Sequence, residues 1–326
     1  MDKFSKKDQE LLFELSLNAR SAMNKIAKKL KVSQQGLSYK LKKLEEKGTI
    51  LHYYTLFDFA CFGYHGYKVI FTLNRTKPEQ VKQFREFLQT QSSVLSIEEL
   101  SGHWDFLVFF ATKNSSRCSK EIHELITQFP KLVKNYVILT NVVSYELQRK
   151  YLLESSAHVS IVAFAGDREP MTVDTMDRKL LSTLYENPRI KYSLLAAKYK
   201  LNPKTVINKI KALETKGIIK GYSTGIDCYK YGYFSQKIFL KLVNFSFEKE
   251  EEILKFCRQQ KNIIKVSKLF GNWDLEMDLE LNTIREFQDF CINLRINFGD
   301  IIKDLETCSV RKQHKLTSLP TSFFSE

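Results

Sequence analysis

Apolar residues in the first 60 positions recur at helical spacing in three short runs. The leucines within residues 11–15 predict a first helix. Further helices are expected from about 22 to 30 and from 34 to about 47, where Gly48 provides a stop. Three helices with a tight second-to-third connection predict a helix-turn-helix, and the β-like run at 50–55 is typical of its wing.

Beyond about residue 66 the pattern changes to the alternation of half-buried strands. Strands are expected at 67–73, 94–101, 106–112 and 132–145, and helices at about 78–90 and 116–129. This βαββαβ order predicts a four-stranded antiparallel sheet with two helices on one face, the ferredoxin-like arrangement. The alternating Val69, Phe71 and Leu73 suggest an apolar second face that needs a partner sheet.

The whole pattern is written twice, at a constant offset of 169 residues. Asp8 recurs as Asp177, and the hairpin Gly102-His103-Trp104-Asp105 recurs as Gly271-Asn272-Trp273-Asp274. The second copy predicts strands at 235–243, 263–270, 275–281 and 301–310, with Ile238, Leu240 and Leu242 in place of the first alternating triplet. Because each copy is a complete unit, one chain carries what a dimer would otherwise assemble, and we expect the two sheets to pack face to face as an intrachain pseudo-dimer.

The expected fold class is therefore α+β, with two tandem copies of a winged helix-turn-helix followed by a ferredoxin-like βαββαβ domain. The expected divisions are a DNA-binding domain at 1–60, an effector and assembly domain at 61–155, a junction at 156–171, and the second copies of the two domains at 172–228 and 229–316. An extra strand is expected near the junction, at 159–165.

Positive charge is concentrated in the two helical segments. Residues 1–50 hold twelve Lys and Arg against six Asp and Glu, and residues 172–222 hold eleven against four, so they carry nearly all of the formal net charge of +14. Two basic heads on a neutral body indicate binding to a polyanion at two spaced points.

Other classes of protein have little support. The start of the chain lacks the apolar core of a secretory signal, and the longest uncharged apolar stretch, 155–166, is too short to cross a bilayer, so we expect a soluble, cytoplasmic protein with no membrane partner. The six cysteines are scattered, without C-x-x-C pairs or histidines at ligand spacing. We therefore expect buried free thiols, no metal site, no cofactor and no catalytic residues.

An ordered set of residues, present in both copies, resembles the leucine-responsive and asparagine-synthesis regulator family, Lrp/AsnC, in a form that fuses two regulator units. The first copy shows it as Asp8-x-x-Leu11-Leu12-x-x-Leu15-x-x-Asn18-x-Arg20, Leu41-x-x-Leu44-Glu45-x-Lys47-Gly48-x-Ile50, Tyr53-x-Thr55-x-x-Asp58 with Gly63-Tyr64, and Gly102-x-x-Asp105.

The resemblance implies a transcriptional regulator whose third helix reads the major groove of double-stranded DNA. The implied DNA contacts are Ser33, Gln34, Gln35, Ser38, Tyr39 and Lys42, and in the second copy Asn202, Lys204, Thr205, Asn208 and Lys211. Glutamine and asparagine can pair bidentately with adenine, while lysines meet phosphates. A solvated helix surface is the alternative for one such face, but two copies that hold nearly all the charge favour DNA.

The resemblance also places a small-molecule site, often for an amino acid, near the hairpin turns. The implied residues are Gly102, Asp105, Gly271 and Asp274. A simple structural turn is the alternative, since Gly and Asp are ordinary turn residues and the preceding tryptophans could fill a small pocket.

Two other functions stay open. A branch with this architecture is similar to sirohaem decarboxylases, but its histidines on the strand before the hairpin are replaced here by Ser96 and Ile97, and by Lys265 and Val266. The other alternative is an architectural nucleoid protein with little sequence preference. Homo-oligomers are expected through strand edges or through the hairpins at Gly102 and Gly271.

Overall fold

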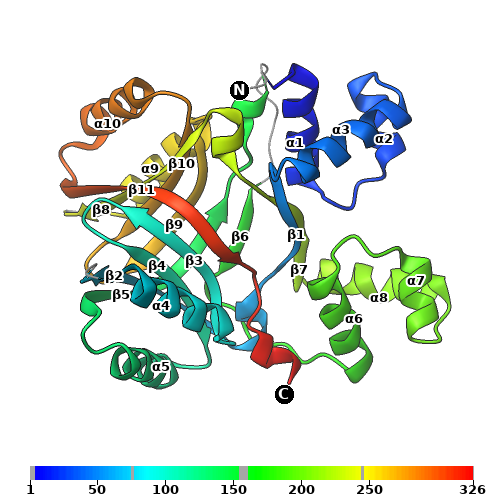
Figure 1. Cartoon of the computed structure of the whole chain (residues 1–326), viewed down its shortest axis with the longest axis horizontal. Helices are drawn as coiled ribbons and strands as arrows, with labels where there is room; N and C mark the ends of the chain where they lie inside the picture. The colour runs from blue at the N-terminus through cyan, green and yellow to red at the C-terminus, as the bar shows by residue number, and fades with distance from the viewer. Residues whose placement is uncertain (1–3, 75–76, 154–160, 244–245, 326) are drawn as a thin grey trace.

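The computed structural model describes residues 4–74, 77–153, 161–243 and 246–325, and contains two helical heads beside a β-barrel (Figure 1). The first head comprises α1 (Lys6–Leu17), α2 (Met23–Leu30) and α3 (Gln34–Glu46), and the second comprises α6 (Thr175–Glu186), α7 (Tyr192–Lys198) and α8 (Pro203–Thr215). Leucines of α1 and α3 pack together in the first head, as the helical spacing predicts. None of the described helices is long and apolar enough to cross a bilayer.

The strand after each head pairs with its counterpart in the other copy. These strands, β1 (Ile50–Phe57) and β7 (Ile219–Ile226), form a two-stranded antiparallel ribbon with Tyr54 opposite Ser223. The expected wing is thus a strand whose backbone partner comes from the second copy. A single strand leaves its N–H and C=O groups unpaired, and the fused copy supplies the missing partner. Two short 3₁₀ turns, Phe59–Phe62 and Cys228–Tyr231, lead from the ribbon into the barrel.

The βαββαβ order is present in both copies. The first contains β2 (His65–Leu73), α4 (Pro78–Thr90), β3 (Val94–Ser101), β4 (Phe106–Thr112), α5 (Ser115–Gln128) and β5 (Val133–Glu146). The second contains β8 (Phe234–Leu242), α9 (Phe247–Gln259), β9 (Ile263–Phe270), β10 (Leu275–Leu281), α10 (Ile284–Phe298) and β11 (Ile302–Leu316). The last strand runs six residues beyond its expected end, because its second part pairs with β3 of the first copy.

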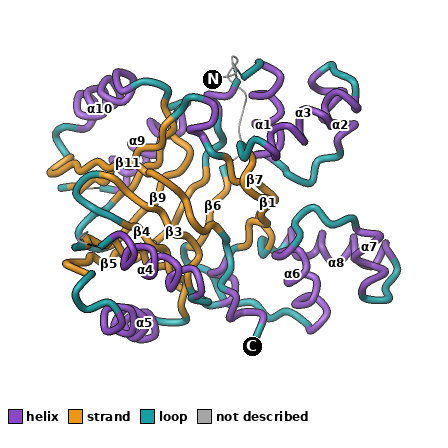
Figure 2. Tube along the Cα trace, viewed as in Figure 1, coloured by secondary structure: helices purple, strands orange, loops and turns teal. Residues whose placement is uncertain are grey.

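The two sheets join at both edges into a closed barrel. β3 pairs with β11 and β5 pairs with β9, while β2 pairs back to β5, so the strand order β2-β4-β3-β11-β8-β10-β9-β5 closes on itself. The helices lie outside the barrel (Figure 2). β6 (Val162–Ala165) extends the sheet beside β5; residues 159 and 160 of the expected extra strand lie outside the described residues. The edges of β3, β5, β9 and β11 are paired between the two copies within one chain.

The face of the sheet that pairs the two copies is not the expected one. Val69, Phe71 and Leu73 pack against α4 and α5, and the triplet of the second copy packs against α9 and α10. The opposite face, with Lys68 on β2 and Lys237 on β8, lines the shared interior. Two copies do pair within the chain, but the alternating apolar residues form the helix-covered cores.

One end of the barrel interior is filled by aromatic side chains. Trp104 and Trp273, from the two hairpins, pack edge to face with ring centroids 6.2 Å apart. Phe239 lies 5.0 Å from the Trp104 ring and 6.1 Å from the Trp273 ring. The polar side chains of the interior lie toward the other end, next to the β1–β7 ribbon.

Candidate nucleic-acid interface

All eleven residues expected to contact DNA are exposed. They lie on α3 and α8 or at the N-cap positions that precede these helices. The inner faces are buried, with Leu37, Leu41 and Leu44 in the first head and Val206, Ile210 and Leu213 in the second. Tyr39 is 69% exposed, which is unusual for an aromatic side chain and leaves its ring available to a partner. The two recognition surfaces are therefore free of the protein core.

Some of these polar groups also hold the helix in shape. The Ser33 hydroxyl accepts a hydrogen bond from the Gly36 amide at 3.1 Å, and the Asn202 side chain accepts one from the Lys204 amide at 2.8 Å. Both are N-caps, which satisfy backbone donors that a helix start leaves unpaired. Ser38 donates to the Gln34 carbonyl at 2.9 Å. The caps fix the helix starts, where base-reading side chains are normally presented.

Each recognition helix is anchored to the start of the first helix of its head. The Lys40 ammonium donates to Asp8 at 2.9 Å, and Lys209 donates to Asp177 and Asp174 at 2.8 Å each. Burial opposes ionisation of Asp8, but hydrogen bonds from Ser5 and Lys40 outweigh it and lower the pKa of Asp8. Lys40 and Lys209 repeat at the same offset of 169 residues as Asp8 and Asp177, and this repetition is the signal for the pair in the sequence.

The two heads contact each other through a reciprocal pair of arginines. The Arg20 guanidinium lies 4.4 Å from the centroid of the Tyr192 ring and donates to the Ile190 carbonyl at 2.8 Å. Arg189, its counterpart, lies 4.6 Å from the centroid of the Tyr53 ring of the first copy. Both heads lie on the same side of the barrel with the ribbon between them (Figure 1). The chain thus presents two recognition helices in one fixed arrangement.

The four residues of the expected effector site lie in the turns between β3 and β4 and between β9 and β10. Gly102 and Gly271 have φ values of 129° and 142°, in the region that favours glycine. The Asp105 carboxylate accepts from the Leu73 amide at 2.5 Å, and the Asp274 carboxylate from the Leu242 amide at 2.7 Å. These contacts tie each turn to the neighbouring strand.

Comparison with known proteins identifies both helical heads as helix-turn-helix domains. A family model described as winged helix-turn-helix DNA-binding matches residues 4–50 and 173–220. The fold of the whole chain is similar to that of a siroheme decarboxylase, NirDL, with a TM-score of 0.59 and 12% identity, covering 98% of this chain and 97% of that chain.

Curated relatives are regulators. An uncharacterised HTH-type transcriptional regulator of Pyrococcus furiosus is 31% identical over 105 residues, which cover 32% of this chain and 70% of the relative. LrpB of Bacillus subtilis, an HTH-type transcriptional regulator, is 27% identical over 150 residues, 46% of this chain and 97% of LrpB. The regulatory protein AsnC of Haemophilus influenzae is 25% identical over 135 residues, 41% of this chain and 89% of AsnC. The chain belongs to the Lrp/AsnC family of helix-turn-helix transcriptional regulators, in a form that fuses two regulator units in tandem.

Proposed function

We propose that this DNA-binding regulator recognises two unlike half-sites at once through α3 and α8. The observation that carries the proposal is the fixed pairing of two exposed recognition helices with different side chains. Gln34, Gln35 and Tyr39 are exposed on the first helix, where the second exposes Lys204 and Asn208. A homodimer reads a palindrome because its two helices are identical. Two different helices in one rigid frame favour a composite, non-palindromic site.

Selection of bound sequences from random duplex DNA tests this. The full chain should return a two-part motif. The double variant Q35A/Y39A should lose preference in one part only, and K204A/N208A in the other. A matched control is Lys82→Ala, an exposed lysine of α4 on the barrel. A palindrome that both variants weaken equally would refute the use of two unlike half-sites.

The ratio of specific to non-specific affinity separates a regulator from an architectural nucleoid protein. A specific regulator typically binds its site at least about 10³-fold more tightly than other DNA. Competition binding at a fixed salt concentration measures this ratio. A ratio near unity would favour the architectural alternative.

We also propose that the chain is not a siroheme decarboxylase, although the fold likeness covers nearly its whole length. Three carboxylates, Glu276, Asp278 and Glu280, line the cavity inside the barrel. A uroporphyrin is itself a polycarboxylate, so at the inner end its carboxylates would meet like charges on β10. Titration with an iron-uroporphyrin should leave the tetrapyrrole absorption spectrum unchanged. A saturable spectral shift would refute this proposal.

Response to an amino acid or another small effector, first expected at Gly102, Asp105, Gly271 and Asp274, stays part of the proposal. The hydrogen bonds from backbone amides to Asp105 and Asp274 are compatible with a purely structural turn and with an effector site. A panel of amino acids in a DNA-binding assay, with Asp274→Asn beside wild type, tests it. Formation of homo-oligomers likewise stays a proposal, and sedimentation of the full chain measures it.

A further inference from the structure

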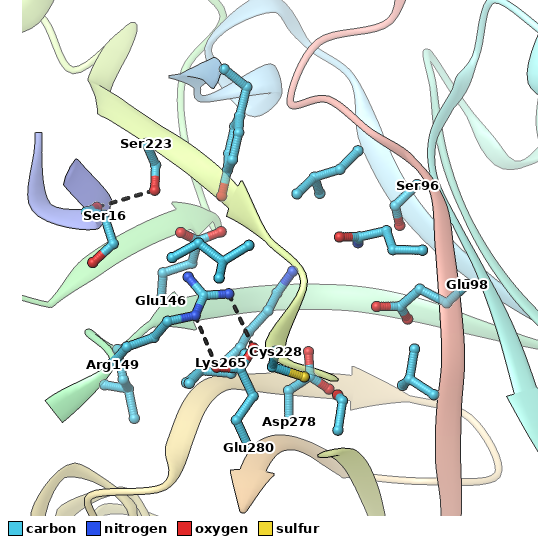
Figure 3. A pocket seen from close by; sticks show the side chains of 18 of the residues that line it. Ser16, Ser96, Glu98, Glu146, Arg149, Ser223, Cys228, Lys265, Asp278 and Glu280 are labelled. Carbon is cyan, nitrogen blue, oxygen red and sulfur yellow. Dashed lines mark hydrogen bonds and ion pairs between the residues drawn. The ribbon is translucent and has the colours of Figure 1, made fainter. Parts of the chain in front are cut away.

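The barrel encloses a cavity of about 540 Å³ at the end that faces the β1–β7 ribbon. Tyr54, Leu56 and Ser223 of the ribbon form one wall, and barrel strands form the others, including Lys68 and Glu98. Figure 3 shows Glu98, Glu146 and Asp278 around the same open space. A volume of this size is typical of cavities that hold a small organic ligand.

The acidic side of the cavity comes from the second copy. Glu276, Asp278 and Glu280 occupy alternate positions of β10, so all three point to the interior. The matching positions of β4 hold Leu107, Phe109 and Ala111. The first copy contributes the carboxylates of Glu98 on β3 and Glu146 on β5. A row of three inward carboxylates on one strand needs compensating positive charge.

The cations inside the cavity compensate these carboxylates unevenly. The Lys237 ammonium lies 2.6 Å from Asp278, 2.8 Å from Glu276 and 2.9 Å from Glu98, so one charge serves three carboxylates. Lys68 also contacts Glu276, and Arg149 pairs with Glu280 at 2.9 Å. Glu276 is thus fully compensated. Asp278 and Glu98 share the Lys237 ammonium, and Lys265 lies opposite Asp278 in the β9–β10 pairing.

Glu146 lies opposite Lys265 in the β5–β9 pairing. Burial raises the pKa of Glu146, and the positive charges of Lys265 and Arg149 only partly offset that effect. Burial raises the pKa of Glu98 as well, against the opposing charge of Lys237. Both carboxylates would be stabilised by one more cation in the cavity.

Further charged groups lie at the rim and have other neighbours. Lys220 lies 3.6 Å from Asp58, and Arg311 lies 3.2 Å from Glu99. Asp227 accepts a hydrogen bond from the Tyr229 amide, and Lys312 is exposed. The inner end is therefore acidic and the rim is basic, which favours a ligand that inserts a positive group inward.

The remaining lining offers apolar contact to a hydrocarbon chain. Its apolar side chains include Leu56, Leu107, Phe109, Leu147, Val162 and Leu316. Methylene groups buried against such surface leave water, which favours binding. A ligand with a short aliphatic chain and a terminal ammonium matches both parts of the cavity.

We propose that this cavity binds a small aliphatic amine whose ammonium group lies among Glu98, Glu146 and Asp278. The site is distinct from the recognition helices and from the hairpin turns. It does not depend on DNA binding, so its test and that of the proposed function can fail separately.

Calorimetric titration of the full chain with 1,5-diaminopentane tests the site. Glutarate, which has five carbons and a carboxylate at each end, is the matched anionic probe, and L-lysine adds a carboxylate to the diamine. Both amines should bind and glutarate should not, because only the amines can place an ammonium group among the carboxylates. No heat or thermal shift up to about 10 mM of either amine, or tighter binding of glutarate than of the amines, would overturn the proposal.

Charge-removing variants locate the binding. Glu146→Gln and Asp278→Asn should each weaken diamine binding about tenfold, since each removes one charged hydrogen-bond acceptor. The matched control Glu251→Gln changes an exposed carboxylate of α9 and should leave the affinity unchanged. If Asp278→Asn does not fold, Glu146→Gln decides, because Glu146 lies outside the ion pairs that Lys237 makes. Equal affinity in wild type and Glu146→Gln would overturn the proposed location.

Discussion

Replacement of Lys237 by methionine should destabilise the chain strongly at neutral pH. Its side chain is 2% exposed, and its ammonium contacts Glu98, Glu276 and Asp278. Methionine keeps most of the volume, so the main loss is the positive charge. Removal of one partner from a buried ion pair typically costs about 3–5 kcal/mol, because the other charge stays buried without compensation. Glu276 keeps Lys68, so we expect a loss in that range and not a multiple of it.

The stability difference between wild type and Lys237→Met should also depend on pH. Burial raises the pKa of Glu276, but the charges of Lys237 and Lys68 outweigh it and lower the pKa overall. In wild type the ionised Glu276 stabilises the fold above its unfolded-state pKa, and this contribution is lost as the pH falls through the lowered folded-state pKa. In Lys237→Met the stranded carboxylates take up protons more readily, so the variant recovers stability on acidification. The stability difference should therefore shrink between pH 7 and about pH 5.

Urea unfolding followed by tryptophan fluorescence measures the effect, because Trp104 and Trp273 pack against each other inside the barrel. The matched control is Lys241→Met on the same strand. Lys241 is 34% exposed and pairs with Asp274 at 3.0 Å, so its loss should cost less than about 1 kcal/mol. A cost for Lys237→Met similar to that of the control, or a difference that widens in acid, would refute the argument.

Three further predictions concern charge and the heads. Glu146→Gln should raise the urea midpoint at pH 7, because the folded-state pKa of Glu146 is raised. This increase in the urea midpoint should vanish below the unfolded-state pKa, where the carboxyl group is protonated in both the folded and the unfolded state. An increase that persists at that pH would contradict the prediction. The double variant R20A/R189A should weaken binding to a composite site about tenfold and relax the required spacing between half-sites, because these arginines connect the two heads. Fluorescence anisotropy with duplexes of different half-site spacing measures both effects. An unchanged dependence on spacing would show that these contacts do not fix the two heads relative to each other. Lys211→Ala should lower the magnitude of the log affinity against log salt slope by about 0.9 if Lys211 meets a phosphate, and an unchanged slope would exclude that contact.

Local patterns predicted the elements of the barrel well. The strands at 94–101 and 106–112 match the structure residue for residue, because the Gly-x-Trp-Asp hairpin separates two runs of alternating character. The exposure of the recognition helices also follows from local spacing, since Leu37, Leu41 and Leu44 mark the buried side of α3.

The interior of the barrel could not be predicted in the same way. Both faces of β2 are buried, so alternation alone does not show which face the helices cover and which face lines the interior. Lys237 and Glu98 are ordinary surface residues by type, and they are buried only because the two copies enclose them together. The contacts of Arg20 with the second head have the same origin: the residue is repeated, but its partner lies about 170 positions away. Pairing between copies is a property of the assembled chain and leaves no local periodicity.

The difference between β10 and β4 shows what a fused chain can do that a symmetric dimer cannot. In a dimer of identical subunits each substitution occurs twice. An inward Glu-x-Asp-x-Glu row would therefore be present in both subunits and would double the buried negative charge. Here Glu276, Asp278 and Glu280 face an interior whose other half keeps Leu107 and Phe109. The two halves differ at these positions, so the cavity is acidic on its β10 side and apolar on its β4 side. A polar occupant would meet two unlike walls, which a symmetric dimer could not offer.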